Sequence, residues 1–291
     1  MLTQDVARAA HGCKATAAVT HKWSSHAALA MYEKEMDFVT HYTVPVRRYV
    51  LATMPRSGST LCSIRLWQSG QLGAPLEYLN FRLATTFLGR LGYTLGEGGL
   101  PGDSTQLWGY WKTLQQLRTS CNGVFGCKAF ISNFMLLAKR YPEFLSRLVP
   151  THVVYLTRKD LVGQAISYYR AQRSHAWFGG IRAVRSPIYD FERIQKCLVS
   201  ICTQMAMWER MFERWGVTPL RVHYEDVCRR PREVVAAVRS HLGVTHDPSA
   251  KLAMPLLIRQ ADNITDEWRA RFLSDCSHSK SAETASSSRE F

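Results

Sequence analysis

The sequence predicts an α/β fold in which a central, mainly parallel sheet is flanked by helices. Four short apolar or β-branched runs alternate with segments of helical periodicity. Gly, Pro, Asn or charged residues bound each run, and a mostly apolar run of this length fits a strand that is covered on both faces. The predicted strands are Tyr49–Met54, Val124–Ile131, His152–Thr157 and Leu220–Tyr224.

The predicted helices follow from apolar residues at helical spacing. Leu61–Gln68 follows the first strand and is closed by Ser69-Gly70. The next helix ends at Asn122-Gly123 and carries Leu107, Trp108, Trp111, Leu114 and Leu117. A third begins at Asp160 and carries Val162, Ala165, Ile166 and Tyr169. The longest runs from about Pro187 to Trp215 and carries a stripe that we expect to be core: Ile188, Phe191, Ile194, Leu198, Ile201 and Met205.

Composition divides the chain into three parts. Residues 1–47 lack sustained periodicity, so we expect an N-terminal extension, with a transit peptide as the alternative. Residues 48–275 hold every predicted strand and form one domain. Residues 276–291 are almost all small or polar, and we expect this tail to be disordered.

The overall composition narrows the class of partner. The 291 residues include 37 Lys and Arg against 23 Asp and Glu, a net charge of +14, which favours an anionic partner. No run reaches the roughly 18 apolar residues of a membrane span and no signal peptide is evident, so we expect a soluble cytoplasmic protein. Eight cysteines without a CxxC pair suggest mostly buried thiols, and ten histidines without HExxH argue against a metal site.

The most informative segment joins the first strand to its helix. It reads Pro55, Arg56, Ser57, Gly58, Ser59 and Thr60. Such a loop directs backbone N–H groups and a helix N-terminus at one point, where an anion is stabilised. The first Gly and the Lys of GxxxxGK[ST] are both absent, which disfavours a nucleoside triphosphate and favours a smaller, single phosphate. A Ser-rich turn that only caps a helix is the alternative.

A second candidate anchor follows the third strand. Arg158 stands at the carboxyl end of that strand, the edge at which open α/β sheets bind ligands. Ser167 lies two helical turns after Asp160, on the same side as the helix start. Without other information, a surface ion pair is the commoner role for an Arg in this position.

Together these segments resemble the PAPS-dependent sulfotransferases, in particular the bacterial Stf-zero (trehalose 2-sulfotransferase-like) family. The resemblance rests on several short motifs that occur in the same order as in the family across residues 48–275. They are residues 54–61, 70–78, Arg158-x-Asp160-x-Val162-x-Gln164-Ala165-x-Ser167, Trp177, Arg259–Asp262 and Asp266–Trp268. The resemblance implies a P-loop-like three-layer domain that uses PAPS as sulfuryl donor, releases PAP and needs no metal.

The resemblance also implies roles for individual residues. Glu77 matches the catalytic base, for which an exposed loop carboxylate is the alternative. The loop 55–60 matches the phosphosulfate site, with Arg56 and Lys128 as donors to the leaving group, although Lys128 is also compatible with a snorkelling surface lysine. By the same resemblance, Arg158 and Ser167 match the residues that bind the 3′-phosphate of the nucleotide, and Tyr224 matches a residue near the adenine. Arg259 matches a residue that closes over the nucleotide, and a helix-flanking ion pair is the alternative for it.

The acceptor is less well defined by the sequence. A carbohydrate or glycolipid hydroxyl is expected from the resemblance, but Ala74 replaces an acidic residue that helps hold trehalose in that family. Trp177 fits a sugar-stacking platform and plain core equally, and the Gly-rich segment 89–102 fits a mobile loop that shapes the acceptor site. Peripheral membrane contact and a homodimer are open.

Three rival functions remain to be separated from sulfuryl transfer. A phosphotransferase on the same scaffold would require Mg²⁺ and tight ATP binding, and the absent loop Lys argues against it. A nucleic-acid binder would show a basic stripe interleaved with aromatics, which we do not find, so no nucleic acid is expected. The third rival is a catalytically dead relative that only binds the nucleotide.

Overall fold

The computed structural model describes residues 31–38, 44–81, 83–96, 99–177, 187–252 and 263–287. Its centre is a sheet of four strands in the order β2-β1-β3-β4, and all three pairings are parallel. The strands are β1 Arg47–Thr53, β2 Val124–Phe130, β3 His152–Thr157 and β4 Leu220–His223. The predicted α/β class is confirmed, and each predicted strand is found within two residues of its expected bounds.

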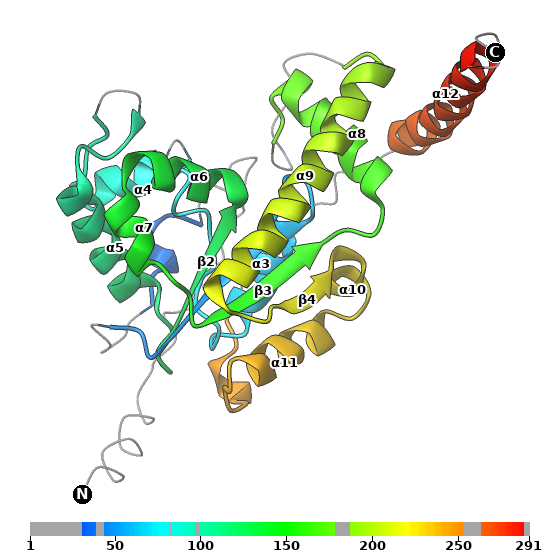
Figure 1. Cartoon of the computed structure of the whole chain (residues 1–291). Coiled ribbons are helices and arrows are strands. Elements are labelled where there is room, and N and C mark those ends of the chain that lie inside the picture. Colours follow the sequence, from blue (N-terminus) through cyan, green and yellow to red (C-terminus); the bar gives the residue numbers. More distant parts are fainter. Residues whose placement is uncertain are drawn as a thin grey trace, which may run out of the picture.

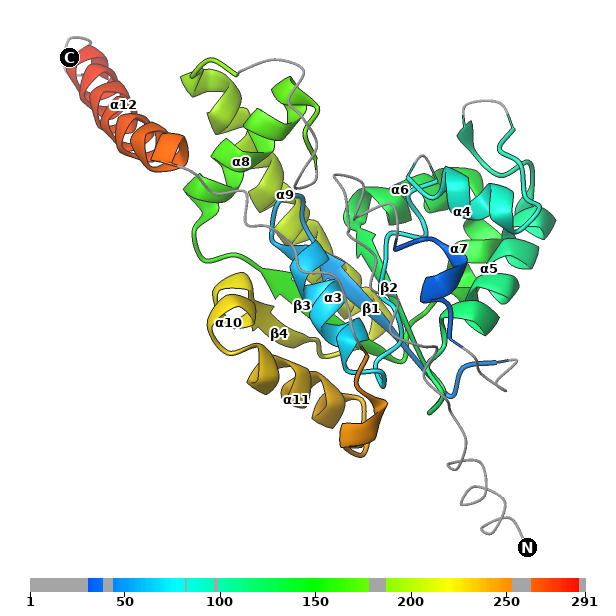
Figure 2. The same cartoon turned by 180° about the vertical axis from the view of Figure 1, so that it is seen from behind.

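Helices cover both faces of the sheet and give three layers (Figures 1 and 2). The principal helices are α3 Ser59–Gln68, α4 Thr85–Arg90, α5 Ser104–Arg118, α6 Ile131–Arg140, α7 Pro142–Arg147, α8 Leu161–Ser174, α9 Phe191–Trp215, α10 Tyr224–Arg229, α11 Pro231–His241 and α12 Asn263–Ser287. Two short 3₁₀ helices, η1 Lys34–Met36 and η3 Pro248–Ala250, lie among them.

Alternation along β1 assigns its side chains to two separate cores. Tyr49 and Leu51 pack on one face with residues of α3 and α11. Val50 and Ala52 pack on the other, where α6 and α9 contribute Phe134 and other side chains. A strand directs successive side chains to opposite faces, so a mostly apolar strand must be covered twice, as the sequence indicates.

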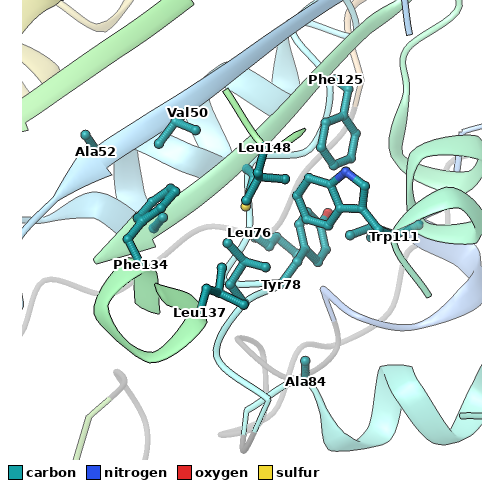
Figure 3. Packing of buried hydrophobic residues seen from close by; sticks show 14 of the residues in the cluster. Val50, Ala52, Leu76, Tyr78, Ala84, Trp111, Phe125, Phe134, Leu137 and Leu148 are labelled. Atoms are coloured by element: carbon teal, nitrogen blue, oxygen red, sulfur yellow. The ribbon is translucent and has the colours of Figure 1, made fainter. Parts of the chain in front are cut away.

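The larger core lies between the sheet, α5 and α6 (Figure 3). Trp111 of α5 meets Phe125 of β2 edge to face at 5.4 Å, and Tyr78 stacks on the same Phe125 at 6.2 Å. Residues 74–79 run beside β2, with a bridge between Leu76 and Cys127. The aromatic packing therefore fixes the segment that carries Glu77 against the edge strand.

The sheet order determines where a ligand can bind. β1 lies between β2 and β3, so the chain crosses from one side of β1 to the other between them. Ligands of open α/β sheets bind at the carboxyl ends of the strands beside such a switch point. The loop 55–60 leaves β1 at that edge, between residues that follow β3 and residues of β2.

Three expectations from the sequence differ from the structure. Helix α9 begins at Phe191, where Asp190 caps it by accepting from the Arg193 amide, so placing Ile188 on the buried stripe is wrong; that side chain is 82% exposed. Helix α12 continues to Ser287, through most of the tail expected to be disordered. That segment contains no Gly or Pro, and residues without either can extend a helix that already exists.

The third difference concerns the N-terminal extension. Met31 and Tyr32 are 2% and 4% exposed and belong to the larger core, so the domain includes residues before 48. Phe38 is also packed against that core, and its amide donates to Leu117 of α5. The residues before Met31 lie outside the described residues.

The expectation of mostly buried thiols is met only in part, since Cys202 and Cys228 are exposed. Cys62, Cys127, Cys197, Cys202, Cys228 and Cys276 are free thiols, and the first three are buried. Burial raises the pKa of the Cys62 and Cys127 thiols to about 12. Cys121 is an exception to the expected free thiols because it is disulfide-bonded.

Two properties of the described residues bear on membranes and metals. Within 31–38, 44–81, 83–96, 99–177, 187–252 and 263–287, no helix combines the length and hydropathy of a bilayer-spanning segment. The same ranges hold no group of three or more His, Cys, Asp or Glu side chains arranged around a common point.

Candidate active site

The loop 55–60 is braced from inside the fold. Ser57 is fully buried, and its hydroxyl lies 2.5 Å from Thr53 Oγ1, which itself donates to the carbonyl of Leu156. Since Thr53 has given its proton to Leu156, Ser57 Oγ is the donor of that contact. Gln164 of α8 donates to the Pro55 carbonyl at 2.8 Å. Ser57 therefore braces the loop with its hydroxyl and cannot also donate that proton to a ligand.

Gly58 is required for two separate reasons. Its φ of +82° lies in the left-handed region, where a side chain is strained. A Cβ at this position would also lie 2.1 Å from Cδ2 of Tyr224, the first residue of α10. The aromatic ring therefore rests against the loop backbone, and α3 begins immediately afterwards at Ser59.

Three arginines gather beside the loop. Arg56 has φ +61°, and its Nε donates to Ser167 Oγ of α8 at 3.0 Å. Arg158 lies over the Tyr224 ring, with its guanidinium carbon 5.3 Å from the ring centroid. Burial, reinforced by the charges of Arg158 and Arg170, lowers the pKa of Arg56 from 12.5 to about 10. The three side chains thus bring like charges close together beside the loop 55–60.

Arg158 has an ion pair and also an unused donor. Its guanidinium lies 3.1 Å from Asp160 Oδ2, so the expected surface ion pair is present. Asp160 also caps α8 through the Gly163 amide and contacts Arg269 of α12. Arg158 Nε is buried and has no hydrogen-bond partner within the described part of the chain. Asp160 thus orients Arg158 without using all of its donors.

On the other side of the loop, the structure brings Glu77, Lys128 and Thr60 together. Lys128 Nζ lies 2.9 Å from Glu77 Oε1 and 3.3 Å from Thr60 Oγ1. Both charged residues are buried, with 7% of Glu77 and 2% of Lys128 exposed. A snorkelling surface lysine is therefore wrong for Lys128, and an exposed loop carboxylate is wrong for Glu77.

The local backbone explains why these two side chains meet. Lys128 is next to Leu51 in the sheet register, and its amide donates to the Leu76 carbonyl at 2.9 Å. This bond aligns residue 77 with residue 128 across the open edge of β2. The pair lies near the point where β1 gives way to the loop 55–60.

Two further residues fix Glu77, and neither was found from the sequence. Asn80 Nδ2 donates to Glu77 Oε2 at 3.0 Å, and the Glu77 amide donates to the Tyr32 hydroxyl at 3.2 Å. Burial raises the pKa of Tyr32, and the nearby Glu77 charge adds to the rise. Asn80 follows Glu77 by three residues, which is a usable sequence signal, but Tyr32 lies in a segment without periodicity.

Arg118 at the end of α5 anchors the segment that carries Tyr32. The side chain is fully buried and forms an ion pair of 3.0 Å with Asp37. It also donates to the carbonyls of Met31, Glu33 and Met36, at 2.9 to 3.3 Å. Residues 31–38 are therefore part of the wall behind Glu77.

The remaining expectations have mixed outcomes. Trp177 is 39% exposed, so plain core is wrong for it, and its carbonyl accepts from Arg56. Ala74 is fully buried, and its carbonyl accepts from the Tyr78 hydroxyl. In the segment 89–102, Leu95 and Pro101 form an antiparallel bridge. Arg259 lies outside the described residues.

Comparisons with known proteins agree on one family. The family model described as Stf0 sulphotransferase matches residues 48–275. Trehalose 2-sulfotransferase of Mycolicibacterium smegmatis is 28% identical over 258 residues, which cover 78% of this chain and 94% of the relative. The Mycobacterium tuberculosis protein of the same name is 27% identical over 259 residues, with the same coverage.

A solved structure has also been matched. It is the sulfotransferase domain of the Synechococcus PCC 7002 olefin synthase, with a TM-score of 0.38 and 15% identity. The match covers 80% of this chain and 96% of that one.

Proposed function

We propose, from the premise that this chain belongs to the Stf0 sulphotransferase family, that it moves a sulfuryl group from PAPS to a hydroxyl of a carbohydrate or glycolipid, with Glu77 as general base. The observation that carries the proposal is the contact chain Glu77, Lys128, Thr60. It connects a buried carboxylate to a loop suited to an anion through a single cation.

The residues around the loop fit the donor. PAPS supplies a sulfuryl group already activated by attachment to a phosphate. The unused Nε of Arg158 and the electropositive environment of Arg56 both favour phosphate oxygens. Ser167, which accepts from Arg56, lies within the same cluster. Arg56, Arg158 and Ser167 would thus hold the nucleotide phosphates, while Tyr224 offers its ring against the loop.

Each bond, the proton and the electron pair of the proposed transfer can be accounted for with the residues present. The acceptor oxygen forms a bond to sulfur while the bond from sulfur to the phosphate oxygen breaks. The hydroxyl proton passes to Glu77, and the electron pair of the broken bond leaves on the phosphate of PAP. Lys128 lies where charge builds between the two ends, and a fixed cation there lowers the barrier without reorganisation.

The acceptor class follows from the relatives. Their names specify a 2-sulfotransferase of trehalose, a sugar with hydroxyls far too weakly acidic to react without a base. In this chain Ala74 is buried and apolar, so the sugar contact expected of the family at that position is absent. We therefore propose a saccharide or glycolipid acceptor other than trehalose, and a cytoplasmic site of action.

The test replaces the base without changing its shape. Glu77→Gln is expected to lower kcat with PAPS and an accepted sugar by about 10²–10⁴. The dissociation constant for PAP, measured by calorimetry without metal, should stay within about threefold, since in the proposed reaction Glu77 contacts the acceptor and not the nucleotide. Glu192→Gln on α9, with its side chain 81% exposed, is the matched control and should leave both quantities unchanged.

Two results would contradict the proposal. Full turnover by Glu77→Gln would mean that another group accepts the proton. Absence of PAP binding by the wild-type chain, with ATP and Mg²⁺ or a DNA duplex bound in its place, would remove sulfuryl transfer altogether. A melting curve of Glu77→Gln shows whether its expected loss of turnover is due to unfolding, because the substitution leaves Lys128 buried without its carboxylate.

A further inference from the structure

A cavity lies away from the proposed active site. It has a volume of about 450 Å³ and is bounded by the last turn of α3, by α11 and by residues 246–251. Helix α3 begins at the loop 55–60 and its ten residues span about 15 Å, so this cavity is at the opposite end of that helix. Figure 2 shows α3, α11 and η3 meeting at the edge of the molecule remote from α8.

The cavity is lined by four cationic side chains that pair with no carboxylate of the described residues. They are Arg65 of α3, Arg232 and Arg239 of α11, and Lys251. None of them takes part in the ion pairs found among the described residues. Their neighbour Arg230 differs, because it pairs with both Asp226 and Glu233. Four like charges around one space repel each other, and an anion in that space would relieve the repulsion.

Asp247, the one acidic residue among the lining residues, offsets one of these four charges and leaves an excess of positive charge. Asp247 Oδ1 accepts from the amide and the hydroxyl of Ser249, at 2.9 and 2.6 Å, and so caps η3. Arg65 donates to Gln68 Oε1 at 3.2 Å, and Arg239 contacts the His246 ring. Neither partner is a carboxylate, so the excess of positive charge in the cavity remains.

The walls of the cavity are fixed before any ligand binds. Gln71 is 5% exposed. Its side-chain Nε2 donates to the Thr245 carbonyl at 2.7 Å, and its side-chain Oε1 accepts from the Asp247 backbone amide at 3.1 Å. The Leu252 amide donates to Gln68 at 2.9 Å. Gly70 has φ +69°, and a Cβ there would lie 1.6 Å from the Ala250 carbonyl. Residues 245–252 are therefore held against the end of α3, which reduces the entropy lost on binding.

We propose that this cavity is a second anion site that binds a phosphate ester with an apolar organic part. Three arginines provide forked donors that match phosphate oxygens, and Lys251 adds a fourth charge. Val235, Pro231 and Pro248 provide the apolar part of the lining. A volume of about 450 Å³ is within the usual range of ligand sites. The proposal is independent of the sulfuryl transfer proposed above.

An anionic lipid headgroup and a free phosphate ester both have this chemistry, and the experiment distinguishes them. The full chain is titrated with phenyl phosphate, a soluble phosphate ester, and with monomeric dihexanoyl phosphatidic acid. In parallel it is sedimented with phosphatidylcholine vesicles that either contain or lack phosphatidic acid. Hydrogen exchange locates the bound probe, since binding here protects the α11 amides and residues 245–252, whereas binding at the donor site protects the loop 55–60.

The decisive test compares two double variants, each of which removes two positive charges. Arg232→Gln with Arg239→Gln alters the cavity, and Arg210→Gln with Arg214→Gln on the exposed part of α9 is the control with the same loss of net charge. We expect the cavity variant to weaken binding of the better probe by at least about tenfold and to abolish the protection of α11. The control variant should change neither by more than about twofold.

Each outcome of these experiments either supports or overturns the proposed anion site. Loss of binding in the cavity variant alone supports the site, and the probe that binds, soluble or vesicle-borne, identifies the source of the phosphate. Equal losses in both variants would mean that net charge alone attracts the anion, which overturns the proposal. Protection confined to the loop 55–60, or no binding of any probe to the wild-type chain, overturns it as well. Melting curves of both variants exclude unfolding as the cause.

Discussion

The ammonium of Lys128 lies between Glu77 and Thr60, so in the proposed reaction this residue serves both stability and chemistry. A lysine that is 2% exposed would cost several kcal/mol if it had no partner, and Glu77 provides one. The base and the cation of the proposed reaction are thus also partners in a buried ion pair. This double use explains why a charged residue is found on an otherwise apolar strand.

Tyr32 tests whether the position of Glu77 matters for turnover. Tyr32→Phe removes the hydroxyl that accepts from the Glu77 amide but keeps the ring that packs on Tyr78 and Phe87 at 6.2 and 6.1 Å. We expect kcat to fall by about two- to tenfold, the equivalent of one hydrogen bond, with an unchanged dissociation constant for PAP. Steady-state kinetics and calorimetry measure the two quantities.

The matched control for Tyr32 is Tyr93→Phe, which removes a hydroxyl 3.4 Å from Thr113 Oγ1 and outside the contacts of Glu77. It should leave kcat unchanged. If Tyr32→Phe instead weakened PAP binding as much as it lowered kcat, the residue would support the site only through general packing.

Arg158 tests the nucleotide side of the loop. Arg158→Ala is expected to weaken PAP binding by about 1.5–3 kcal/mol, the usual contribution of a hydrogen bond to a charged group. Asp160 keeps its contact with Arg269 and its cap on α8, so the fold should tolerate the change. The control is Arg221→Ala, which breaks a surface pair with Glu209. An unchanged dissociation constant for PAP would place Arg158 outside the site.

At the scale of elements, α5 determines the position of Glu77 from a distance. Its last residue, Arg118, holds residues 31–38 through Asp37 and three backbone carbonyls. Asp37 is also held by Arg90 of α4, at 2.7 Å. Two helices therefore fix the segment that carries Tyr32. Residues 31–38 precede the family match at 48–275, so the segment that helps to position Glu77 lies outside the region that the family model matches.

The contact between β3 and α11 predicts a dependence of stability on pH. His152 and His241 lie edge to face, with ring centroids 5.3 Å apart. Burial lowers the pKa of both, and for His152 the charges of His241 and Arg47 lower it further. Folding therefore favours the neutral rings, so below about pH 6.5 the unfolded chain takes up protons that the folded chain does not.

The free energy of unfolding should accordingly fall as the pH drops from about 7 to about 5, with part of the slope due to this pair. Chemical denaturation across that range measures the slope. His241→Gln should make it shallower, whereas His278→Gln, at an exposed position on α12, should not change it. An identical slope in both variants would mean that carboxylates alone produce the pH dependence.

At the scale of the whole molecule, the sequence predicts the sheet better than the limits of the helices. The strands are found because apolar runs bounded by turn residues require cover on both faces. The start of α9 was misplaced because Ile188 continues the apolar spacing, whereas the Asp190 cap begins the helix later. The order β2-β1-β3-β4 is a tertiary property that no local pattern contains.

The candidate site was likewise predicted only in part from the sequence. Glu77 and Lys128 were assigned from a family resemblance, and their contact depends on the bond between the Lys128 amide and Leu76, which forms only at the edge of the finished sheet. Tyr32 and Arg118 were missed because 45 and 87 residues separate them from Glu77 and from the Met31 carbonyl, respectively. Periodicity in a short window carries no information about partners so far apart.

The last prediction concerns the stability of the whole chain and its ligand. The guanidinium of Arg56 lies half-buried beside Arg158 and Arg170, and burial together with these charges lowers its pKa to about 10, still far above neutrality. It therefore remains charged at pH 7, and because its pKa is lowered on folding, the cost of burying it is constant at any pH well below 10. An anion at the loop 55–60 removes that cost, so PAP should stabilise the folded chain.

We expect PAP at about 100 times its dissociation constant to stabilise the wild-type chain by about 2.7 kcal/mol, measured by denaturation with and without ligand. Arg56→Gln should leave the ligand-free chain as stable as wild type or more so, because a buried like charge has gone, and at the same PAP concentration it should gain much less. The opposite pattern, a less stable ligand-free variant with the full PAP effect, would mean that the bonds of Arg56 to Ser167 and Trp177 outweigh its charge, and that the loop holds its anion without this side chain.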